Sequence, residues 1–428
     1  NIRMHNSARS LRYGRFADSA GTADRFRFGN NRSQPHRYLA FQTDLGGWNN
    51  ILMQFEIMVV LAWITGRILV LPPAKPFYLL GEEPRLLEDF LDLNQLRRQL
   101  SVLTAKEFVE VSKLDREIAA DEKYHEFMHD HGLSPQWNGL QNVLLFPSSA
   151  LQIRPELQAR LRRPGEAVRQ PVTISDEAEN CDILYFPMTA GHRMFGVAEC
   201  FCLFGDEKLE RQARALLRDC VRFRQDIIKL AERAINAPML AGTRYSAFHI
   251  RRGDFQYGKT RIGAKQILEH TQALLSPDQP VYVATDESDK AFLDVFRDKY
   301  EVVTFGDLPR DIVADTPPHW CGIIETLICA PAPGRFIGTR LSTFSSRISL
   351  LRGHLSFTKG GDFEKIDANL YYTQPPLDAK PKRRWSARFW KTGPKQADPS
   401  VETGMSWWLS KDPVWARAYK ACWAETEG

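Results

Sequence analysis

Short apolar runs and segments of helical period alternate through the second half of the chain, and this alternation limits the fold more than any other feature of the sequence. The apolar runs are rich in Val, Ile, Phe and Tyr, as in residues 280–286. Strands and helices that alternate in this way predict a parallel sheet with helices on both faces. We expect strands at residues 245–251, 280–286, 301–305 and 335–339, and helices at residues 263–275, 288–299, 319–330 and 343–353.

The first half of the chain opens with a βαβ pattern of its own. The helix of this pattern carries apolar residues three and four apart, at Ile51, Phe55, Met58, Val59, Ala62 and Trp63. Two such halves predict the fold class α/β, with two Rossmann-like domains that face each other across a cleft and hold a nucleotide and a second substrate there. We expect a strand at residues 37–43, a tight turn at 44–50, a helix at 51–64 and a strand at 67–71.

The middle of the chain predicts long helices and a domain boundary. Residues 86–131 and 206–237 have helical periodicity, and residues 182–187 predict a strand. Pro238 and Gly242 end the second helix just before the second βαβ series begins.

The domain organisation follows from this boundary. We expect an N-terminal domain at residues 37–240 and a C-terminal domain at 241–428, whose tail loses its periodicity beyond His354. Residues 1–36 are rich in Arg, Asn, Ser and Gly and predict a flexible stem.

Composition excludes several classes of protein. A chain of 428 residues that is 43% hydrophobic is long enough for two cores and too apolar to be disordered. Its net charge of +5 is low for a dedicated nucleic-acid binder but suits an anionic small molecule, so we expect no nucleic-acid partner. The seven cysteines form no CxxC pair, which argues against a zinc ribbon.

Targeting signals are sparse in this sequence. We find no apolar run long enough to cross a bilayer, and we expect that an N-terminal signal or anchor has been lost from the sequence, which lacks an initial methionine. The sequon that begins at Asn31 is compatible with a secretory route.

The arginine pair Arg251-Arg252 follows the expected strand at 245–251 and precedes Gly253 and Asp254. Side chains at the carboxyl end of a buried strand lie where open α/β sheets bind ligands. Because a guanidinium group is always charged and offers a planar fork of donors, it suits a phosphate or diphosphate. The alternative is a solvated surface turn.

The turn at 44–50 contains Gly46 and Gly47, which let backbone amides approach an anion at the helix N-terminus. Asn49 is expected either to cap that helix or to hydrogen-bond a sugar. The alternative is a plain tight turn in a Rossmann-like domain.

Residues 125–129 match the HExxH pattern of zinc peptidases. Pro135 stands where the third histidine of the extended pattern belongs, so the ligand set is incomplete. The alternative interpretation, which we favour, is that His129 and His131 close the last turn of a helix before Gly132.

Several motifs occur together in an order that resembles the GDP-fucose-dependent O-fucosyltransferases, above all the type that acts on thrombospondin repeats. The first turn and the sequence up to Pro72-Pro73 are similar to the opening of this superfamily, and the double glycine is similar to its plant branch. The resemblance covers about residues 37–73 and 245–354. The motifs of the second half lie at residues 249–255, 281–286, 323–330 and 336–345.

This resemblance implies a GT-B fold and an inverting, metal-independent fucosyltransferase. GDP-β-L-fucose is the expected donor substrate, bound mainly by the C-terminal half, and no cofactor is expected. The expected acceptor is a Ser or Thr hydroxyl of a protein, and the product an α-fucoside. The alternatives are a glycan acceptor, or a non-catalytic relative that binds the nucleotide sugar. The implied location is the secretory pathway, in the Golgi or the endoplasmic reticulum, with an N-terminal anchor as the expected means of retention.

The resemblance also assigns residues. Arg251 matches the essential arginine of the family and is expected to bind the diphosphate, while Arg252 should point to the other face of its strand. Glu325 falls where the family has an aspartate that contacts the nucleotide, although the spacing from there to Ser342 differs by about one residue. His249 is expected to contact the nucleotide or sugar, or to serve only in packing. The remaining expected donor-binding residues are Gly46, Gly47, Asn49, Ser342, Thr343 and Phe344.

The catalytic base is the point at which this sequence departs from the family. The thrombospondin-repeat enzymes carry a glutamate where this chain has Gly46. Asp44 and Asp254 are the nearest carboxylates to this position and to the arginine pair, and we prefer Asp44 as the residue that takes the acceptor proton.

Overall fold

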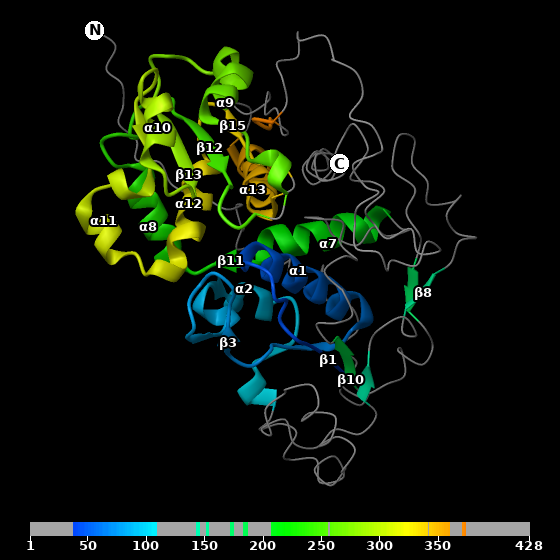
Figure 1. The fold of residues 1–428 in the computed structure, drawn as a ribbon. Helices are drawn as coiled ribbons and strands as arrows, with labels where there is room; N and C mark the ends of the chain where they lie inside the picture. The colour runs from blue at the N-terminus through cyan, green and yellow to red at the C-terminus, as the bar shows by residue number, and fades with distance from the viewer. Residues whose placement is uncertain are drawn as a thin grey trace. The chain divides into compact units, whose positions relative to one another are not determined.

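The computed structural model describes residues 37–108, 143–145, 151–153, 172–174, 183–186, 207–255, 257–340, 342–359 and 370–373. The expected stem at 1–36 and the HExxH segment at 125–129 lie outside these residues. Contacts divide the described residues into two compact units, one ending at Gln225 and the other beginning at Asp226. Each unit is an α/β structure with its own sheet (Figure 1). The arrangement of two domains across a cleft stays a prediction.

The N-terminal unit contains a five-stranded parallel sheet of order β6-β2-β1-β10-β7. The expected βαβ unit is confirmed, because β1 and β2 pair in parallel and α1 connects them. The expected strand at 182–187 is confirmed as β10. The strands are β1 (Tyr38–Phe41), β2 (Ile68–Val70), β6 (Val102–Leu103), β7 (Val143–Leu145) and β10 (Ile183–Phe186).

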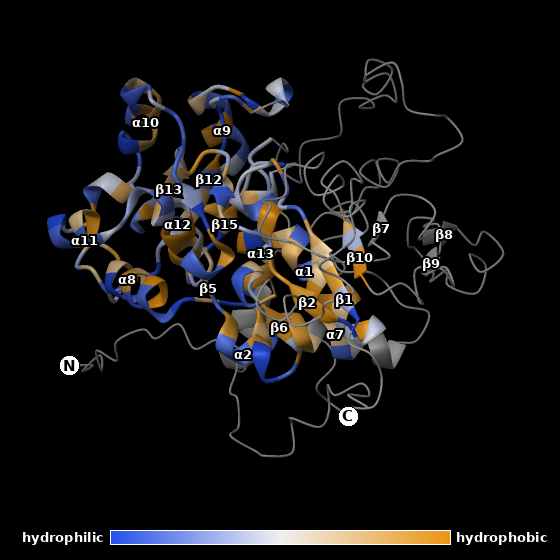
Figure 2. Ribbon diagram, turned by 90° about the horizontal axis from the view of Figure 1, so that it is seen from below, coloured by the Kyte–Doolittle hydropathy of each residue, from blue (hydrophilic) through white to orange (hydrophobic). Residues whose placement is uncertain are grey.

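Helix α1 (Trp48–Thr65) lies at the centre of this unit and is buried along most of its length. It packs against β1, β2 and α7 (Glu207–Cys220), and Figure 2 shows hydrophobic colouring along α1, β1 and β2. The helix ends at Gly66, whose left-handed φ of 63° is a conformation that glycine adopts without strain.

The expected long helix at 86–131 is wrong over its described part. This stretch forms short elements, namely the 3-10 helix η1 (Leu87–Asp89), β5 (Leu91–Asp92), α2 (Leu93–Arg97) and β6. Side-chain caps begin new short elements here: the Leu86 amide donates to the Asp89 carboxylate at 2.8 Å at the start of η1, and the Asn94 amide donates to the Asp92 carboxylate at 2.9 Å at the start of α2. Short acidic side chains compete with helical hydrogen bonds in this way.

The expected single helix at 206–237 is also wrong, because a short strand divides it. The elements are α7 (Glu207–Cys220), β11 (Arg222–Phe223) and α8 (Gln225–Ile235). Strand β11 pairs antiparallel with β5, and the Arg224 amide donates to the Phe90 carbonyl at 3.0 Å. This pairing joins segments more than a hundred residues apart, and it overrides the local helical period. Further short pairs are β3 (Lys75–Pro76) with β4 (Pro84–Arg85), and β8 (Leu151–Ile153) with β9 (Val172–Ile174).

The C-terminal unit contains a four-stranded parallel sheet of order β14-β13-β12-β15. The four strands expected here are confirmed as β12 (Ser246–Ile250), β13 (Val281–Thr285), β14 (Val302–Val303) and β15 (Phe336–Ile337). The four helices are confirmed as α9 (Ala264–Thr271), α10 (Lys290–Arg297), α12 (Cys321–Cys329) and α13 (Thr343–Lys359), and the structure adds the short helix α11 (Arg310–Asp315).

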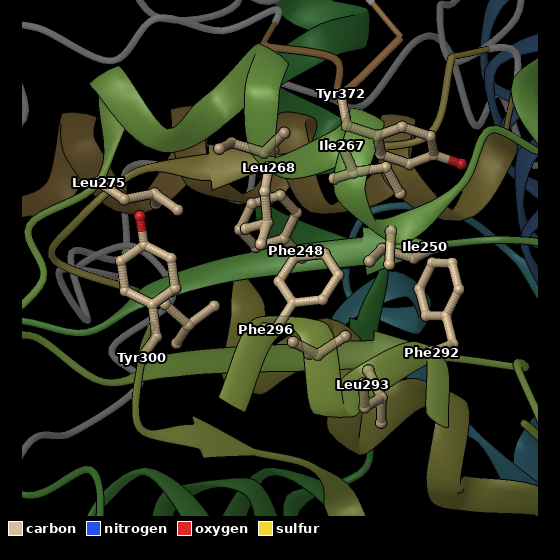
Figure 3. Packing of buried hydrophobic residues seen from close by; sticks show 14 residues of the cluster. Phe248, Ile250, Ile267, Leu268, Leu275, Phe292, Leu293, Phe296, Tyr300 and Tyr372 are labelled. Atoms are coloured by element: carbon tan, nitrogen blue, oxygen red, sulfur yellow. The ribbon is translucent and has the colours of Figure 1, made fainter. Parts of the chain in front are cut away.

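The core of this unit lies between the sheet and helices α9 and α10. Phe248 and Ile250 project from β12 toward side chains of these two helices (Figure 3). Helices α12 and α13 pack against each other, and α12 lies on β12 and β13. The predicted α/β class, with helices on both faces of a parallel sheet, is therefore confirmed.

Two features extend this unit beyond what periodicity predicts. The Arg352 side chain on α13 is buried and donates to the carbonyls of Cys329, Ala330, Ala332 and Gly334, which ties the end of α12 and the loop after it to α13. Residues 370–373 return to the sheet, where Tyr371 forms a parallel bridge with Gly338. The periodicity of the sequence ends at His354, but α13 continues to Lys359 and residues 370–373 belong to this unit. None of the helices in the described part of the chain has the length and hydropathy of a membrane span.

Candidate functional site

Strand β12 is the point at which the chain changes direction across the C-terminal sheet. The chain proceeds from β12 to β13 and β14 on one side, and then returns to β15 on the other side of β12. In open α/β sheets ligands bind at such a switch point, beyond the carboxyl ends of the strands. The residues that follow β12 and β15 are therefore the best placed in this unit to meet a ligand.

Arg251 follows β12 directly and lies between two carboxylates. Its guanidinium group forms ion pairs with Asp286, which follows the neighbouring strand β13, and with Asp254. The Arg251 side chain remains 21% exposed. Gly253 is needed here, because a Cβ at this position would clash with the Asp286 carboxylate. The pairs fix the guanidinium group at the edge of the sheet while leaving it accessible to an anion.

Asp286 is a residue that sequence reasoning missed. One oxygen of its carboxylate pairs with Arg251, and the other accepts a hydrogen bond from the Arg252 amide at 2.6 Å. The signal in the sequence was an acidic residue directly after the strand next to β12, where parallel strands place their ends side by side.

The Arg252 side chain points away from Arg251 and contacts residues of α10 and of the segment before α9. It forms an ion pair with Glu287 and donates to the Ile262 carbonyl at 2.5 Å. Its guanidinium carbon lies 4.5 Å from the centre of the Phe292 ring, a cation–π contact. These contacts give the Arg252 side chain a structural role.

His249 is buried within β12 and contacts the start of α13. Its Nδ1 lies 2.7 Å from the Ser345 hydroxyl, and its ring stacks on Phe344 with centroids 4.3 Å apart. Burial, and then the charge of Arg251, lower the pKa of His249 to about 3. The imidazole is therefore neutral at physiological pH. These contacts account for a packing role, and contact with a nucleotide stays a prediction.

Ser342, Thr343 and Phe344 form the start of α13, beyond the carboxyl end of β15. The Ser342 carbonyl accepts the Ser346 amide at 3.1 Å, which begins the helical hydrogen bonding. The first amides of a helix have no partner within the helix and carry partial positive charge. A helix of 17 residues thus begins beside the switch point and offers amides to an anion there.

Glu325 lies on α12, the helix that packs on β12 and β13. Although the residue as a whole is only partly buried, its carboxyl group is desolvated, which raises its pKa to about 8, while the Tyr282 hydroxyl opposes this shift. At neutral pH the group is mostly protonated. A protonated carboxyl donates one hydrogen bond, so its use as an acceptor for two donors of a guanine edge requires loss of this proton.

In the N-terminal unit, Asp44 organises the turn between β1 and α1. Its carboxylate accepts the Gly46 amide at 2.6 Å, and its own amide donates to the Gln54 side chain at 2.6 Å. Lys75 lies near enough for the Asp44 charge to raise its pKa, but burial has the larger effect and lowers it overall. The Lys75 ammonium donates to the Thr43 carbonyl. Lys75 was not apparent from the sequence, because it approaches Asp44 only through the fold.

The glycines of this turn have different surroundings. Gly47 is the N-cap of α1, with no side-chain cap, and its carbonyl accepts the Asn50 amide at 2.8 Å. Asn49 lies in the first turn of the helix, so the expectation that it caps the helix is wrong. A Cβ at Gly46 would clash with the Asn50 side chain, so a glutamate in its place requires that side chain to move.

The structure gathers the expected site residues into two groups. Arg251, His249 and residues 342–344 lie together around the ends of β12 and β15. Glu325 lies on α12, which packs on β12 and β13. Asp44, Gly46, Gly47 and Asn49 lie together in the other unit, also at a switch point, since the chain passes from β1 to β2 and β6 and then to β7 and β10 on the other side of β1. Across the described residues, no three His, Cys, Asp or Glu side chains are grouped as ligands for a metal ion.

Comparison with known proteins gives one family and several similar structures. The model of the GDP-fucose protein O-fucosyltransferase family matches residues 38–355. A crystal structure of POFUT1 in complex with GDP is similar at 14% sequence identity and a TM-score of 0.41, over 76% of this chain and 97% of that chain. The fucosyltransferase NodZ from Bradyrhizobium is similar at 13% identity and a TM-score of 0.41, over 74% of this chain and 94% of that chain. No curated protein matches this chain in sequence.

Proposed function

Since the chain belongs to the GDP-fucose protein O-fucosyltransferase family, we propose that it transfers L-fucose from GDP-fucose to a Ser or Thr hydroxyl of a protein, with inversion and without a metal ion. The observation that carries this proposal is the combination of Arg251 with the start of α13 at the switch point of the C-terminal sheet. A guanidinium group and helix amides are the donors that a sugar diphosphate requires.

The proposed reaction places these groups on the leaving phosphate. The bond between the anomeric carbon of fucose and the β-phosphate oxygen breaks, and the electron pair stays on GDP. Arg251 and the first amides of α13 stabilise the charge that develops on this phosphate, a role that elsewhere falls to a metal ion. The acceptor oxygen bonds to the anomeric carbon from the opposite face, which turns the β-linked donor into an α-fucoside.

The acceptor proton needs a base, for which we propose Asp44. Its carboxylate is held by the Gly46 amide at 2.6 Å, which fixes its orientation. Asp254 is less suitable, because its ion pair with Arg251 already occupies the carboxylate. Asp44→Asn removes the base and keeps the contact with the Gly46 amide, so it should lower transfer about 10²- to 10⁴-fold while GDP binding persists.

Exposed apolar side chains near the start of α1 support a protein acceptor. Leu45 is 64% exposed and Leu79 is 60% exposed, and Leu79 lies 3.9 Å from where a Cβ of Gly47 would be. Leu79 also has a φ of 68°, a strained conformation for a leucine, and such strain is found at functional sites. A protein surface offers apolar groups that cover these side chains, as interface cores do.

The test is transfer from radiolabelled GDP-fucose in EDTA, with thrombospondin-repeat domains and oligosaccharides as separate acceptors. Arg251→Ala should lower transfer by about 10²- to 10³-fold. Arg297→Ala is the matched control, because this exposed arginine lies on α10 and forms a surface ion pair with Asp294 of the same helix. Wild-type activity that survives in Arg251→Ala would refute the assignment.

The same assay separates the alternatives. Transfer only to oligosaccharides would make the protein a glycan fucosyltransferase. Tight GDP binding without hydrolysis or transfer would identify a non-catalytic relative, which the glycine at position 46 favours.

A further inference from the structure

The Thr339 hydroxyl continues the connection between β12 and β15 beyond the last backbone pairs. The paired register of the two strands ends at Phe248 with Ile337. The Ala247 amide donates to the Arg335 carbonyl at 2.8 Å, and alternate residues of β12 present their backbone groups on this same edge. The next groups on the edge are the His249 carbonyl and the Arg251 amide.

Both of these groups bind the Thr339 side chain. Thr339 Oγ1 donates to the His249 carbonyl at 2.8 Å and accepts the Arg251 amide at 2.9 Å. Thr339 is fully buried, so water cannot replace these hydrogen bonds. One hydroxyl therefore fixes the backbone of Arg251 against the residue that follows β15.

The backbone of Thr339 is fixed in turn to the start of α13. Its amide donates to the Ser345 hydroxyl at 2.8 Å, and the same hydroxyl lies 2.7 Å from Nδ1 of His249. Helix and strand approach closely here, because a Cβ at Gly338 would lie 2.8 Å from Ser345 Oγ. Thr339 thus joins the two elements that carry the proposed phosphate ligands.

The segment at 370–373 also contacts the Thr339 hydroxyl, through Tyr372. The Tyr372 hydroxyl lies 3.1 Å from Thr339 Oγ1, and the Tyr372 ring is packed beside Ile267 in the core (Figure 3). The Tyr372 carbonyl also lies 2.8 Å from Nδ1 of His270. Tyr372 therefore supplies a nearby hydroxyl whose removal leaves the contacts of Thr339 with β12 intact.

We infer that Thr339 is a positioning residue for the sugar diphosphate: its hydroxyl sets the distance between the Arg251 guanidinium group and the first amides of α13. This inference rests on the proposed function. A diphosphate spans two separate sets of donors, and misplacement of one set relative to the other by a fraction of an ångström weakens binding and catalysis together. A nucleoside without phosphates does not depend on that distance.

The test compares Thr339→Val, which has nearly the same shape without the hydroxyl, with Thr339→Ser, which keeps the hydroxyl. Binding of GDP is measured by calorimetry, binding of guanosine by competition with GDP, and turnover with GDP-fucose. We expect Thr339→Val to weaken GDP binding at least tenfold and to lower kcat, while guanosine affinity changes less than threefold. Thr339→Ser should stay within about threefold of wild type in every measurement.

Two further variants keep the test decisive if Thr339→Val does not fold. Ser345→Ala removes the link from the Thr339 amide to α13 and should also weaken GDP binding without changing guanosine binding. Tyr372→Phe is the matched control and should bind GDP like wild type. Wild-type GDP affinity in folded Thr339→Val or Ser345→Ala, or an equal loss for GDP and guanosine, would overturn the inference. Wild-type protein that binds no GDP would instead overturn the proposed function.

Discussion

Replacement of His249 by asparagine should make the stability of the protein less sensitive to acid. His249 is only 4% exposed, and its pKa is lowered to about 3 by burial and by the neighbouring charge of Arg251. In the unfolded chain the same imidazole returns to a pKa of about 6.5. Asparagine keeps a polar group near Ser345 but cannot take up this proton.

The sign and size of the effect follow from these two pKa values. As pH falls below about 6.5, the unfolded chain binds a proton that the folded protein does not bind, so the free energy of unfolding decreases. Each pH unit in this window is worth about 1.4 kcal/mol. Between about pH 7.5 and about pH 4.5, wild type should therefore lose roughly 2 to 3 kcal/mol that the His249→Asn variant retains.

The measurement is urea unfolding at several pH values across this window, with circular dichroism and tryptophan fluorescence as the two signals that monitor the transition. Phe344→Leu serves as the control, because it removes the stacked ring and keeps the histidine, so it should lower stability and preserve the pH dependence. Parallel profiles for wild type and His249→Asn would show that the imidazole is not held neutral, and the account of this site would be wrong.

Three further predictions concern the C-terminal unit. Gly253→Ala should lower fucose transfer about tenfold with little change in the melting temperature. The added methyl group displaces the Asp286 carboxylate from Arg251. Unchanged transfer would contradict this prediction. Arg352→Met should lower the free energy of unfolding by roughly 3 to 5 kcal/mol, because four carbonyls each lose a hydrogen bond from the buried guanidinium group. Urea unfolding that matches wild type would exclude this anchoring role. Glu325→Gln should stabilise the protein at about pH 8 and change its stability little at about pH 5. Burial raises the pKa of this carboxyl, so its ionisation with rising pH favours the unfolded chain, and glutamine cannot ionise. Equal effects on stability at both pH values would contradict this prediction.

Elements with a strong local period were predictable from the sequence. The run at 281–285 is apolar and β-branched, and it is a buried strand, because its side chains face helices on both sides of the sheet. The segment at 206–237 had an equally clear period, yet β11 interrupts it to pair with β5. Periodicity reports which side of an element is buried, and it contains no information about a distant partner strand.

In the candidate site, too, only the local features were predictable from the sequence. Arg251 lies at the end of its strand, as the alternation of strands and helices predicts. Asp286, Thr339 and Lys75 were missed, since each acquires its partner only when strands distant in sequence become neighbours. The position of a charged residue along a strand is local information, but the groups that orient it are not.

The return of residues 370–373 to the sheet means that the folding unit is longer than the stretch by which the family is identified. The family match stops at residue 355, whereas the Tyr372 ring, seventeen residues later, fills part of the core. A shortened chain that ends with the family match would leave a hole the size of an aromatic side chain, which in other proteins costs about 3 to 5 kcal/mol. Limits drawn from family similarity alone would therefore yield a fragment that is poorly folded, and whose inactivity says nothing about its chemistry.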